Sequence, residues 1–181
     1  MDKLLVTIIA LFLVVGGYCL IWQNIKTQSE PIKTAAIASF EECVAAGNMI
    51  MESYPRQCGT PDGKHFAENI GNANELSDLI VVDSPRPNSV VKSPLAITGK
   101  ARGTWYFEAS FPVQVVNANN NVLGQIPAQA QGDWMTEDFV PFTAQLEFAT
   151  PTTATGNLIL KNDNPSGLPA NDKQLVIPVK F

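Results

Sequence analysis

Residues 110–131 read SFPVQVVNANNNVLGQIPAQAQ, and this stretch holds the pattern that decides the fold. In its first half, Val113 and Val115 alternate with Gln114, which is the period of a strand that buries one face. Residues 117–121 (NANNN) follow, and asparagine tolerates the positive φ angles of a tight hairpin turn. The stretch therefore predicts two antiparallel strands joined by a hairpin.

The same kind of pattern recurs on both sides of this hairpin. Short apolar or alternating runs are separated by clusters of Pro, Gly, Asn and Asp, and no long helical period interrupts them. We expect strands at residues 79–83, 95–101, 110–117, 122–131, 140–149, 157–162 and 174–181. Short strands at this density predict an all-β fold, an immunoglobulin-like antiparallel β-sandwich of about seven strands over residues 79–181.

The N-terminal part of the chain has a different character. Residues 4–22 (LLVTIIALFLVVGGYCLIW) are long and apolar enough for a membrane helix, so residues 1–26 predict a single-pass anchor. No run of small residues marks a cleavage site, which favours an uncleaved signal anchor. Cleavage and lipidation of Cys19 are the alternatives, although Tyr18 stands where a lipidation motif has a small residue. The polar residues 27–38 predict a linker.

Residues 39–72 predict a small α+β module that contains two cysteines. Ser39 and Glu42 have the spacing of a helix capping box. Cys43 and Cys58 lack zinc-ligand spacing, and we expect them to form a disulfide, since so small a segment cannot bury enough surface to hold itself together. A redox pair is the alternative, but the C-x-x-C motif is absent. Disulfides persist in oxidising compartments, so the part that follows the anchor is expected outside the cytoplasmic membrane.

Composition limits the possible functions. The net charge of −5 argues against a nucleic-acid-binding protein. The one histidine, His65, has no metal-ligand partner in sequence, and the chain lacks hydrolase, zinc-protease and phosphate-loop motifs. We therefore expect no cofactor, no metal and no enzymatic activity. The alternative is a carbohydrate- or peptidoglycan-processing enzyme that uses Glu108 and Asp133 as an acid/base pair.

A candidate binding surface follows from strand direction. If consecutive strands alternate, the connections at residues 102–109, 132–139 and 163–173 lie at one end of the sandwich, as antigen-binding loops do. These connections gather unusual polar and aromatic residues. The candidate binding residues are Arg102, Trp105, Tyr106, Glu108, Asp133, Trp134, Asp163, Asn164 and Ser166.

Three interpretations of this end stay open at this point. In the first, Trp105 and Trp134 cap the core while Arg102 pairs with Glu108 or an aspartate. In the second, the exposed aromatic rings bind a sugar or a protein partner. In the third, oxygen ligands form a calcium site. The residues of that site would be Asp133, Glu137, Asp138, Asp163 and Asp172.

Three blocks of sequence carry a resemblance to a known family. They are SPRPNSVVKSPLAITGKARGTWYFEASFPV (84–113), GDWMTEDFVPF (132–142) and DNPSGLP (163–169). Together they resemble the immunoglobulin-like domain of bacterial spore germination, and the likeness covers roughly residues 79–181. The two-cysteine segment looks like a small module found before such domains. The resemblance implies a protein of the bacterial envelope, with a link to spore germination. Together with the composition and the expected anchor, we expect a non-catalytic binding or structural module that contacts another envelope protein or a cell-wall glycan.

Overall fold

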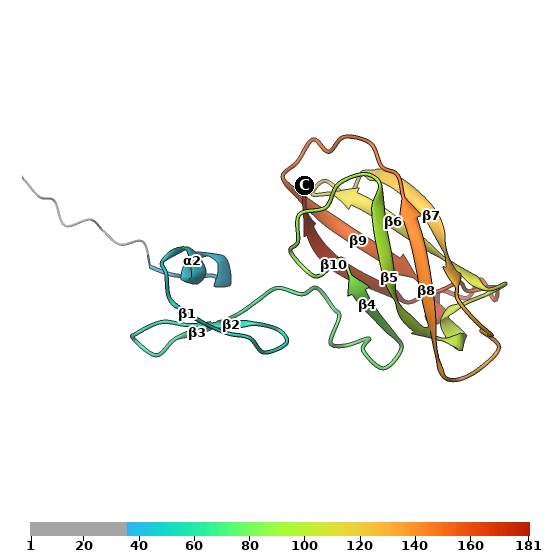
Figure 1. Cartoon of the computed structure of the whole chain (residues 1–181), viewed down its shortest axis with the longest axis horizontal. Helices are drawn as coiled ribbons and strands as arrows, with labels where there is room; N and C mark the ends of the chain where they lie inside the picture. Colours follow the sequence, from blue (N-terminus) through green and yellow to red (C-terminus); the bar gives the residue numbers. More distant parts are fainter. Residues whose placement is uncertain (1–35) are drawn as a thin grey trace, which may run out of the picture. The chain divides into compact units, whose positions relative to one another are not determined.

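The computed structural model describes residues 36–181, which are drawn in colour in Figure 1. The predicted anchor and most of the predicted linker lie outside the described residues. In the part that is described, no helix is long and apolar enough to cross a membrane.

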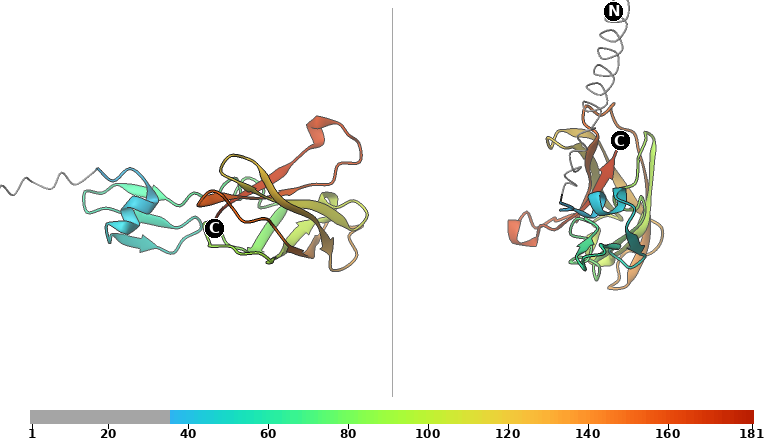
Figure 2. Two further views of the ribbon diagram at one scale, coloured as in Figure 1. Left: turned by 90° about the horizontal axis from the view of Figure 1, so that it is seen from above. Right: turned by 90° about the vertical axis from the view of Figure 1, so that its left-hand side faces the viewer.

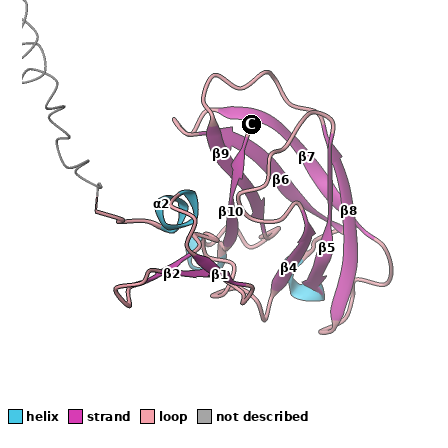
Figure 3. Ribbon diagram, turned by 60° about the vertical axis from the view of Figure 1, so that its left-hand side comes forward, coloured by secondary structure: helices cyan, strands magenta, loops and turns pink. Residues whose placement is uncertain are grey.

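The two-cysteine segment folds as one short helix and a three-stranded antiparallel sheet (Figure 3). Helix α2 covers Phe40–Ala45, and its N-cap Ser39 accepts the Glu42 N–H at Oγ over 3.1 Å. The Glu42 carboxylate turns back to accept the Ala38 N–H, so the predicted cap forms. The sheet has the order β1-β2-β3. Its strands are β1 (Met49–Met51), β2 (Gln57–Gly59) and β3 (His65–Ala67).

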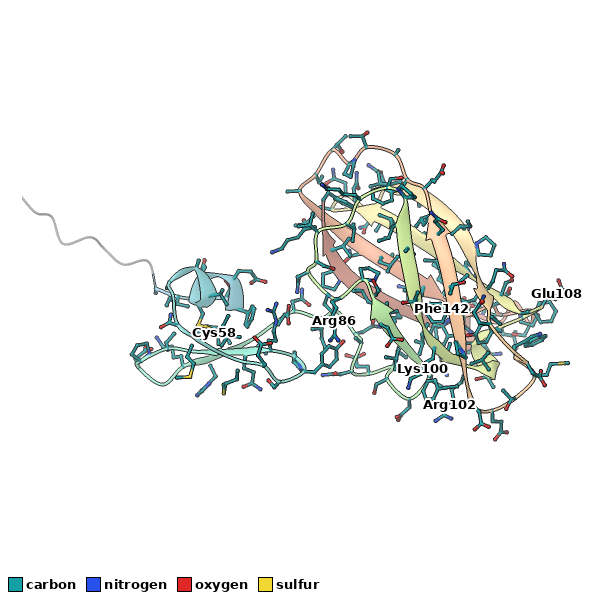
Figure 4. The ribbon with its side chains drawn as sticks, in the orientation of Figure 1. Cys58, Arg86, Lys100, Arg102, Glu108 and Phe142 are labelled. Carbon is teal, nitrogen blue, oxygen red and sulfur yellow. A yellow bond between two sulfur atoms is a disulfide. The ribbon has the colours of Figure 1, made fainter. Side chains whose placement is uncertain are left out.

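The disulfide expected from the sequence is present. Cys43 on α2 and Cys58 on the central strand β2 are bridged, with their Cα atoms 6.1 Å apart, and both are fully buried. Figure 4 labels Cys58 and draws the sulfur atoms in yellow. The bond fastens the helix to the sheet, as a segment with so few buried side chains requires.

An ion pair adds to this small structure. The Arg56 guanidinium donates to Glu68 through Nε over 2.9 Å and through Nη2 over 2.6 Å. The side chain of Glu68 is only 6% exposed, and the Asn88 amide donates to it as well, over 3.1 Å. Hydrogen bonds from Arg56 hold the pKa of Glu68 below its ordinary value. The pair thus stabilises the charged form of a nearly buried carboxylate.

The remaining strands form an antiparallel sheet that closes into an immunoglobulin-like sandwich. Their order is β10-β9-β6-β7-β8-β5-β4. The strands are β4 (Ile80–Ser84), β5 (Leu95–Arg102), β6 (Ser110–Asn117), β7 (Val122–Ala130), β8 (Phe139–Leu146), β9 (Thr155–Lys161) and β10 (Gln174–Lys180). Every strand expected from the sequence is found, and the fold class is confirmed.

Differences from the expected strand ends have local causes. Strand β8 ends at Leu146 rather than at residue 149, because the Phe148 N–H bonds the Ser93 hydroxyl instead of a neighbouring strand. The β6–β7 hairpin turns where it was expected, with Asn120 at φ +62°. The Asn117 carboxamide accepts two backbone N–H groups inside this turn.

The core lies between the two layers of the sandwich. Phe111 is central, and its ring makes edge-to-face contacts with Phe142 at 4.9 Å and with Tyr106 at 5.2 Å between centroids. Alternate residues of each strand complete the core, as the burial pattern of β5 shows. This packing fixes the positions of the strand ends, and the connections between these ends form the candidate site.

Candidate functional site

Three connections adjoin at one end of the sandwich, as the alternating strand directions predict. They are residues 102–109, 131–138 and 162–173, and we call them together the loop pole. Figure 2 (left) shows all three at the same end, with the third connection, in red, projecting furthest. The first connection bonds both others, since the Gly103 N–H donates to Asp138 O over 3.2 Å and the Asp163 N–H donates to Trp105 O over 3.0 Å.

Two of the candidate aromatic residues are core residues. Trp105 is 2% exposed and Tyr106 is 4% exposed, and both rings pack edge-on against Phe111. The Tyr106 hydroxyl donates to Val140 O over 2.7 Å, and burial raises the pKa of Tyr106 to about 12. The two rings anchor the first connection from beneath. They are not available to stack on a ligand.

Trp134 supports the second connection in a similar way. Its side chain is half-buried and packs against the core cluster. The backbone of this connection presses on the 3₁₀ helix η1 (Gly103–Trp105), where a Cβ on Gly103 would lie 1.8 Å from Thr136 O. Only glycine fits there, so the first and second connections are locked together. These contacts favour the core-capping interpretation for Trp105 and Trp134.

Arg102 makes different contacts from those expected. Its guanidinium carbon lies 4.2 Å from the centre of the Phe139 ring, and its nitrogens donate to Asp78 O and Glu137 O. Among residues 36–181 the ion pairs are Arg56–Glu68 and Lys64–Asp62. The expectation that Arg102 pairs with Glu108 or an aspartate is therefore wrong. Its charge is met by backbone carbonyls and an aromatic face, and it ties β5 to the second connection.

The third connection is cross-linked by its own side chains. The Asn164 amide donates to Leu168 O over 2.9 Å and to Asp172 Oδ1 over 2.7 Å, and the Ser166 hydroxyl donates to Asn164 Oδ1 over 2.5 Å. Asn171 donates to the same hydroxyl over 3.0 Å. A hollow of about 400 Å³ lies between this connection and η1, with Asp163 in its wall. The polar residues of this connection thus build a shaped loop.

Glu108 and Asp133 are exposed on separate connections. Figure 4 shows Glu108 at the far end of the sandwich, well removed from the labelled Phe142. Glu108 and Ala109 both have positive φ angles, +49° and +62°, a conformation that side chains with a Cβ rarely adopt. Two backbone hydrogen bonds between Phe107 and Ser110, over 3.0 and 3.1 Å, close this two-residue turn.

The carboxylates proposed as calcium ligands do not gather into a metal site. Within residues 36–181, no three His, Cys, Asp or Glu side chains come together in an arrangement that could hold a metal ion. Asp133 instead accepts the Met135 N–H over 3.0 Å, and Asp172 accepts the Asn164 amide. The Asp133 and Asp172 carboxylates therefore accept hydrogen bonds within the turns in which they lie.

The structure also reveals side chains that sequence reasoning missed. Each connection of the loop pole exposes one large apolar residue, which we call the three apolar tips. Phe107 is 40% exposed, Met135 is 77% exposed and Leu168 is 60% exposed. The available signal was a bulky apolar residue inside an otherwise polar turn, for instance Met135 in GDWMTED. An interpretation based on the periodicity of buried faces does not detect such isolated residues.

Comparison with known proteins identifies the family of the sandwich. Neither the curated proteins nor the solved structures contain a match to the chain. A family model described as the immunoglobulin-like domain of bacterial spore germination matches residues 79–167, which include strands β4 to β9 and most of the loop pole. Residues 79–167 therefore belong to the family of immunoglobulin-like domains of bacterial spore germination.

Proposed function

We propose that this protein is a non-catalytic module of the bacterial cell envelope that binds another envelope component through the loop pole. In this proposal residues 4–22 are a single-pass anchor in the cytoplasmic membrane, and the rest of the chain lies on the outer side. Three findings support it: the apolar run itself, the Cys43–Cys58 disulfide, which suits an oxidising compartment, and the immunoglobulin-like family of the sandwich.

One observation favours the loop pole as the binding surface. The buried rings of Trp105 and Tyr106 anchor the first connection, the half-buried ring of Trp134 supports the second, and hydrogen bonds among its own side chains cross-link the third. Each connection also presents one exposed apolar side chain. Rigid loops with exposed apolar side chains are the usual form of a binding surface on a sandwich scaffold. Single exposed apolar residues are common, but here each of three hydrogen-bonded connections carries one.

The experiment is site-specific photo-crosslinking in the native envelope. The full chain carries benzoylphenylalanine in place of Glu108, on the loop pole. The matched control carries it in place of Asn119, which is also exposed but lies in the hairpin at the opposite end. We expect a defined adduct from position 108 and none from position 119. Equal labelling from both positions, or none from either, would refute the proposal.

The identity of the adduct separates the classes of partner. The description of the family includes spore germination, so a germination protein is one class of component that the experiment can find. A cell-wall glycan is another. Turnover of wall fragments that is lost in Glu108→Gln would instead favour the enzyme alternative.

A further inference from the structure

We infer that the partner of the loop pole is a protein whose contact surface has an apolar centre and a positively charged surround. This inference rests on the proposed function and narrows it. It excludes an anionic membrane surface, an anionic wall polymer and a second copy of this chain as the occupant of the loop pole. The argument uses the apolar tips, the charges around them and the adjoining hollow.

The apolar tips supply the centre of the contact. Met135 and Leu168 are more than half exposed, and Phe107, which precedes the turn at Glu108 and Ala109, is 40% exposed. Burying such side chains in a complex is worth about 25 cal/mol for each Å² of apolar surface. Met and Phe are also among the residue types enriched in protein interfaces. The tips are therefore suited to an apolar patch on another protein.

Most of the charged side chains on the three connections are negative. The loop pole contains six carboxylates, and none takes part in an ion pair in the structure of residues 36–181. They belong to Glu108, Asp133, Glu137, Asp138, Asp163 and Asp172. Its cationic side chains are Arg102 and Lys173, and the Arg102 guanidinium is already engaged with Phe139 and two carbonyls. The carboxylates thus give the loop pole a negative electrostatic potential, which attracts lysine and arginine side chains of a partner protein.

The hollow beside η1 offers a place for one such side chain. It is polar, has a volume of about 400 Å³, and includes Asp163, Asn162 and Thr104 in its wall. The Asp163 carboxylate is half-buried and accepts no hydrogen bond among the described residues, so it can accept from an incoming cation. Charge-assisted hydrogen bonds of this kind fix the orientation of a partner.

The negative charges of the loop pole also disfavour the binding of a membrane surface, an anionic wall polymer or a second copy of this chain. Anionic lipid headgroups and anionic wall polymers would approach six unpaired carboxylates of their own sign. Two loop poles placed face to face would bring twelve such carboxylates together. Electrostatic repulsion therefore opposes these contacts, and a cationic protein surface is the complementary choice.

Methionine methyl groups give a direct test with an internal control. The four methionines include Met135 on the loop pole and Met49 on β1, and the two are equally exposed at 77%. The full chain, labelled with ¹³C-methyl methionine and held in zwitterionic lipid nanodiscs, is titrated with three probes. These are a leucine–lysine amphipathic peptide, its leucine–glutamate counterpart, and vesicles that contain phosphatidylglycerol.

We expect the Met135 signal to shift with the lysine peptide alone, while the Met49 signal stays in place. Salt should weaken the effect, because the attraction is between exposed charges. The variant Asp133→Asn/Glu137→Gln/Asp138→Asn should raise the dissociation constant about tenfold. The control Glu41→Gln/Glu52→Gln/Glu147→Gln removes the same number of negative charges from exposed positions outside the loop pole, and should leave the dissociation constant unchanged.

Other outcomes overturn the inference. Equal shifts of Met49 and Met135 would show unspecific apolar binding, and a Met135 shift with the anionic vesicles or the glutamate peptide would refute the charge argument. If position 108 gives an adduct but the Met135 signal does not shift, the proposed function stands and this inference is refuted. If position 108 gives no adduct, both are refuted.

Discussion

Asn72 and Val176 are hydrogen-bonded to each other in both directions. The Val176 N–H donates to Asn72 Oδ1 over 2.7 Å, and the Asn72 N–H donates to Val176 O over 3.4 Å. The Asn72 amide also donates to Gln174 O over 2.9 Å. One side chain thus takes the place of a neighbouring strand beside β10. Residues 88–91 bond the rest of this edge, so its backbone groups are covered.

The Asn72 contact gives the first prediction. Replacing Asn72 by alanine removes both side-chain hydrogen bonds and leaves the edge of β10 open near Val176. We expect a loss of about 1–3 kcal/mol in the free energy of unfolding, measured by chemical denaturation. The control Asn74→Ala, an exposed neighbour whose side chain makes no hydrogen bond in the described structure, should change it by less than about 0.5 kcal/mol. Equal effects of the two changes would contradict the prediction.

Tyr106 gives a prediction at high pH. The ordinary pKa of tyrosine is 10, and burial raises that of Tyr106 to about 12. As pH rises, the tyrosine therefore loses its proton at a lower pH in the unfolded chain than in the folded chain. The contribution of Tyr106 to the free energy of unfolding is present below pH 10 and is lost as pH rises to about 12. Tyr106→Phe should cost about 1 kcal/mol at neutral pH through the lost bond to Val140, and should lack the alkaline loss. The measurement is the free energy of unfolding against pH for both proteins, and parallel curves would count against it.

Glu68 gives a prediction at low pH. Its pKa is lowered from 4.5 by hydrogen bonds from Arg56, so the folded chain holds the carboxylate charged where the unfolded chain protonates it. This stabilisation is present above the pKa of the unfolded state and is lost as pH falls through the lower pKa of the folded state. Glu68→Gln should therefore be less stable than the wild type at pH 7 by about 1–3 kcal/mol. The difference should shrink below about pH 4, and a difference independent of pH would argue against the ion pair.

The disulfide gives a prediction for both stability and compartment. Cys43 and Cys58 are separated by 15 residues, and closing a loop of this size stabilises a fold by about 3 kcal/mol in the chain-entropy model. Cys43→Ser/Cys58→Ser should unfold residues 39–67 while the sandwich keeps its cooperative transition, as followed by hydrogen exchange. Mass spectrometry of the protein taken from cells should find the bridge intact. Two free thiols there would contradict the proposed location outside the cytoplasmic membrane.

The sequence was sufficient for the sandwich because its information is local. Alternation such as Val113–Gln114–Val115 and turn residues such as those at 117–121 specify strands and hairpins without knowledge of distant contacts. The cap of α2 followed from the spacing of Ser39 and Glu42, and the Cys43–Cys58 bridge from the absence of zinc-ligand spacing and the small size of the segment. The antiparallel order of the strands then placed the three connections at one end.

The environments of the side chains at that end could not be predicted from the sequence. Trp105 and Tyr106 lie in a loop segment rich in polar residues, yet Phe111 and Val140 draw both into the core. Acidic residues occur on all three connections, but the ring of Phe139 and backbone carbonyls are what contact the Arg102 guanidinium. Asn72 bonds a strand that begins about a hundred residues later in the chain. Each outcome depends on a contact between distant segments, which a single sequence does not encode visibly.

The central claim is that the exposed apolar tips, and not the buried aromatic rings, carry recognition at the loop pole. The most direct measurement is the yield of the photo-crosslink from position 108 in the native envelope, compared between the parent chain and Phe107→Ser/Met135→Ser/Leu168→Ser. Because Met135 and Leu168 are mostly exposed, each of these two changes should alter the free energy of unfolding by no more than about 0.5 kcal/mol, whereas Phe107→Ser, at a side chain that is 40% exposed, should cost about 1 kcal/mol. We predict that the adduct falls at least about tenfold while the variant keeps its cooperative unfolding transition. An undiminished adduct from a folded variant would contradict the account.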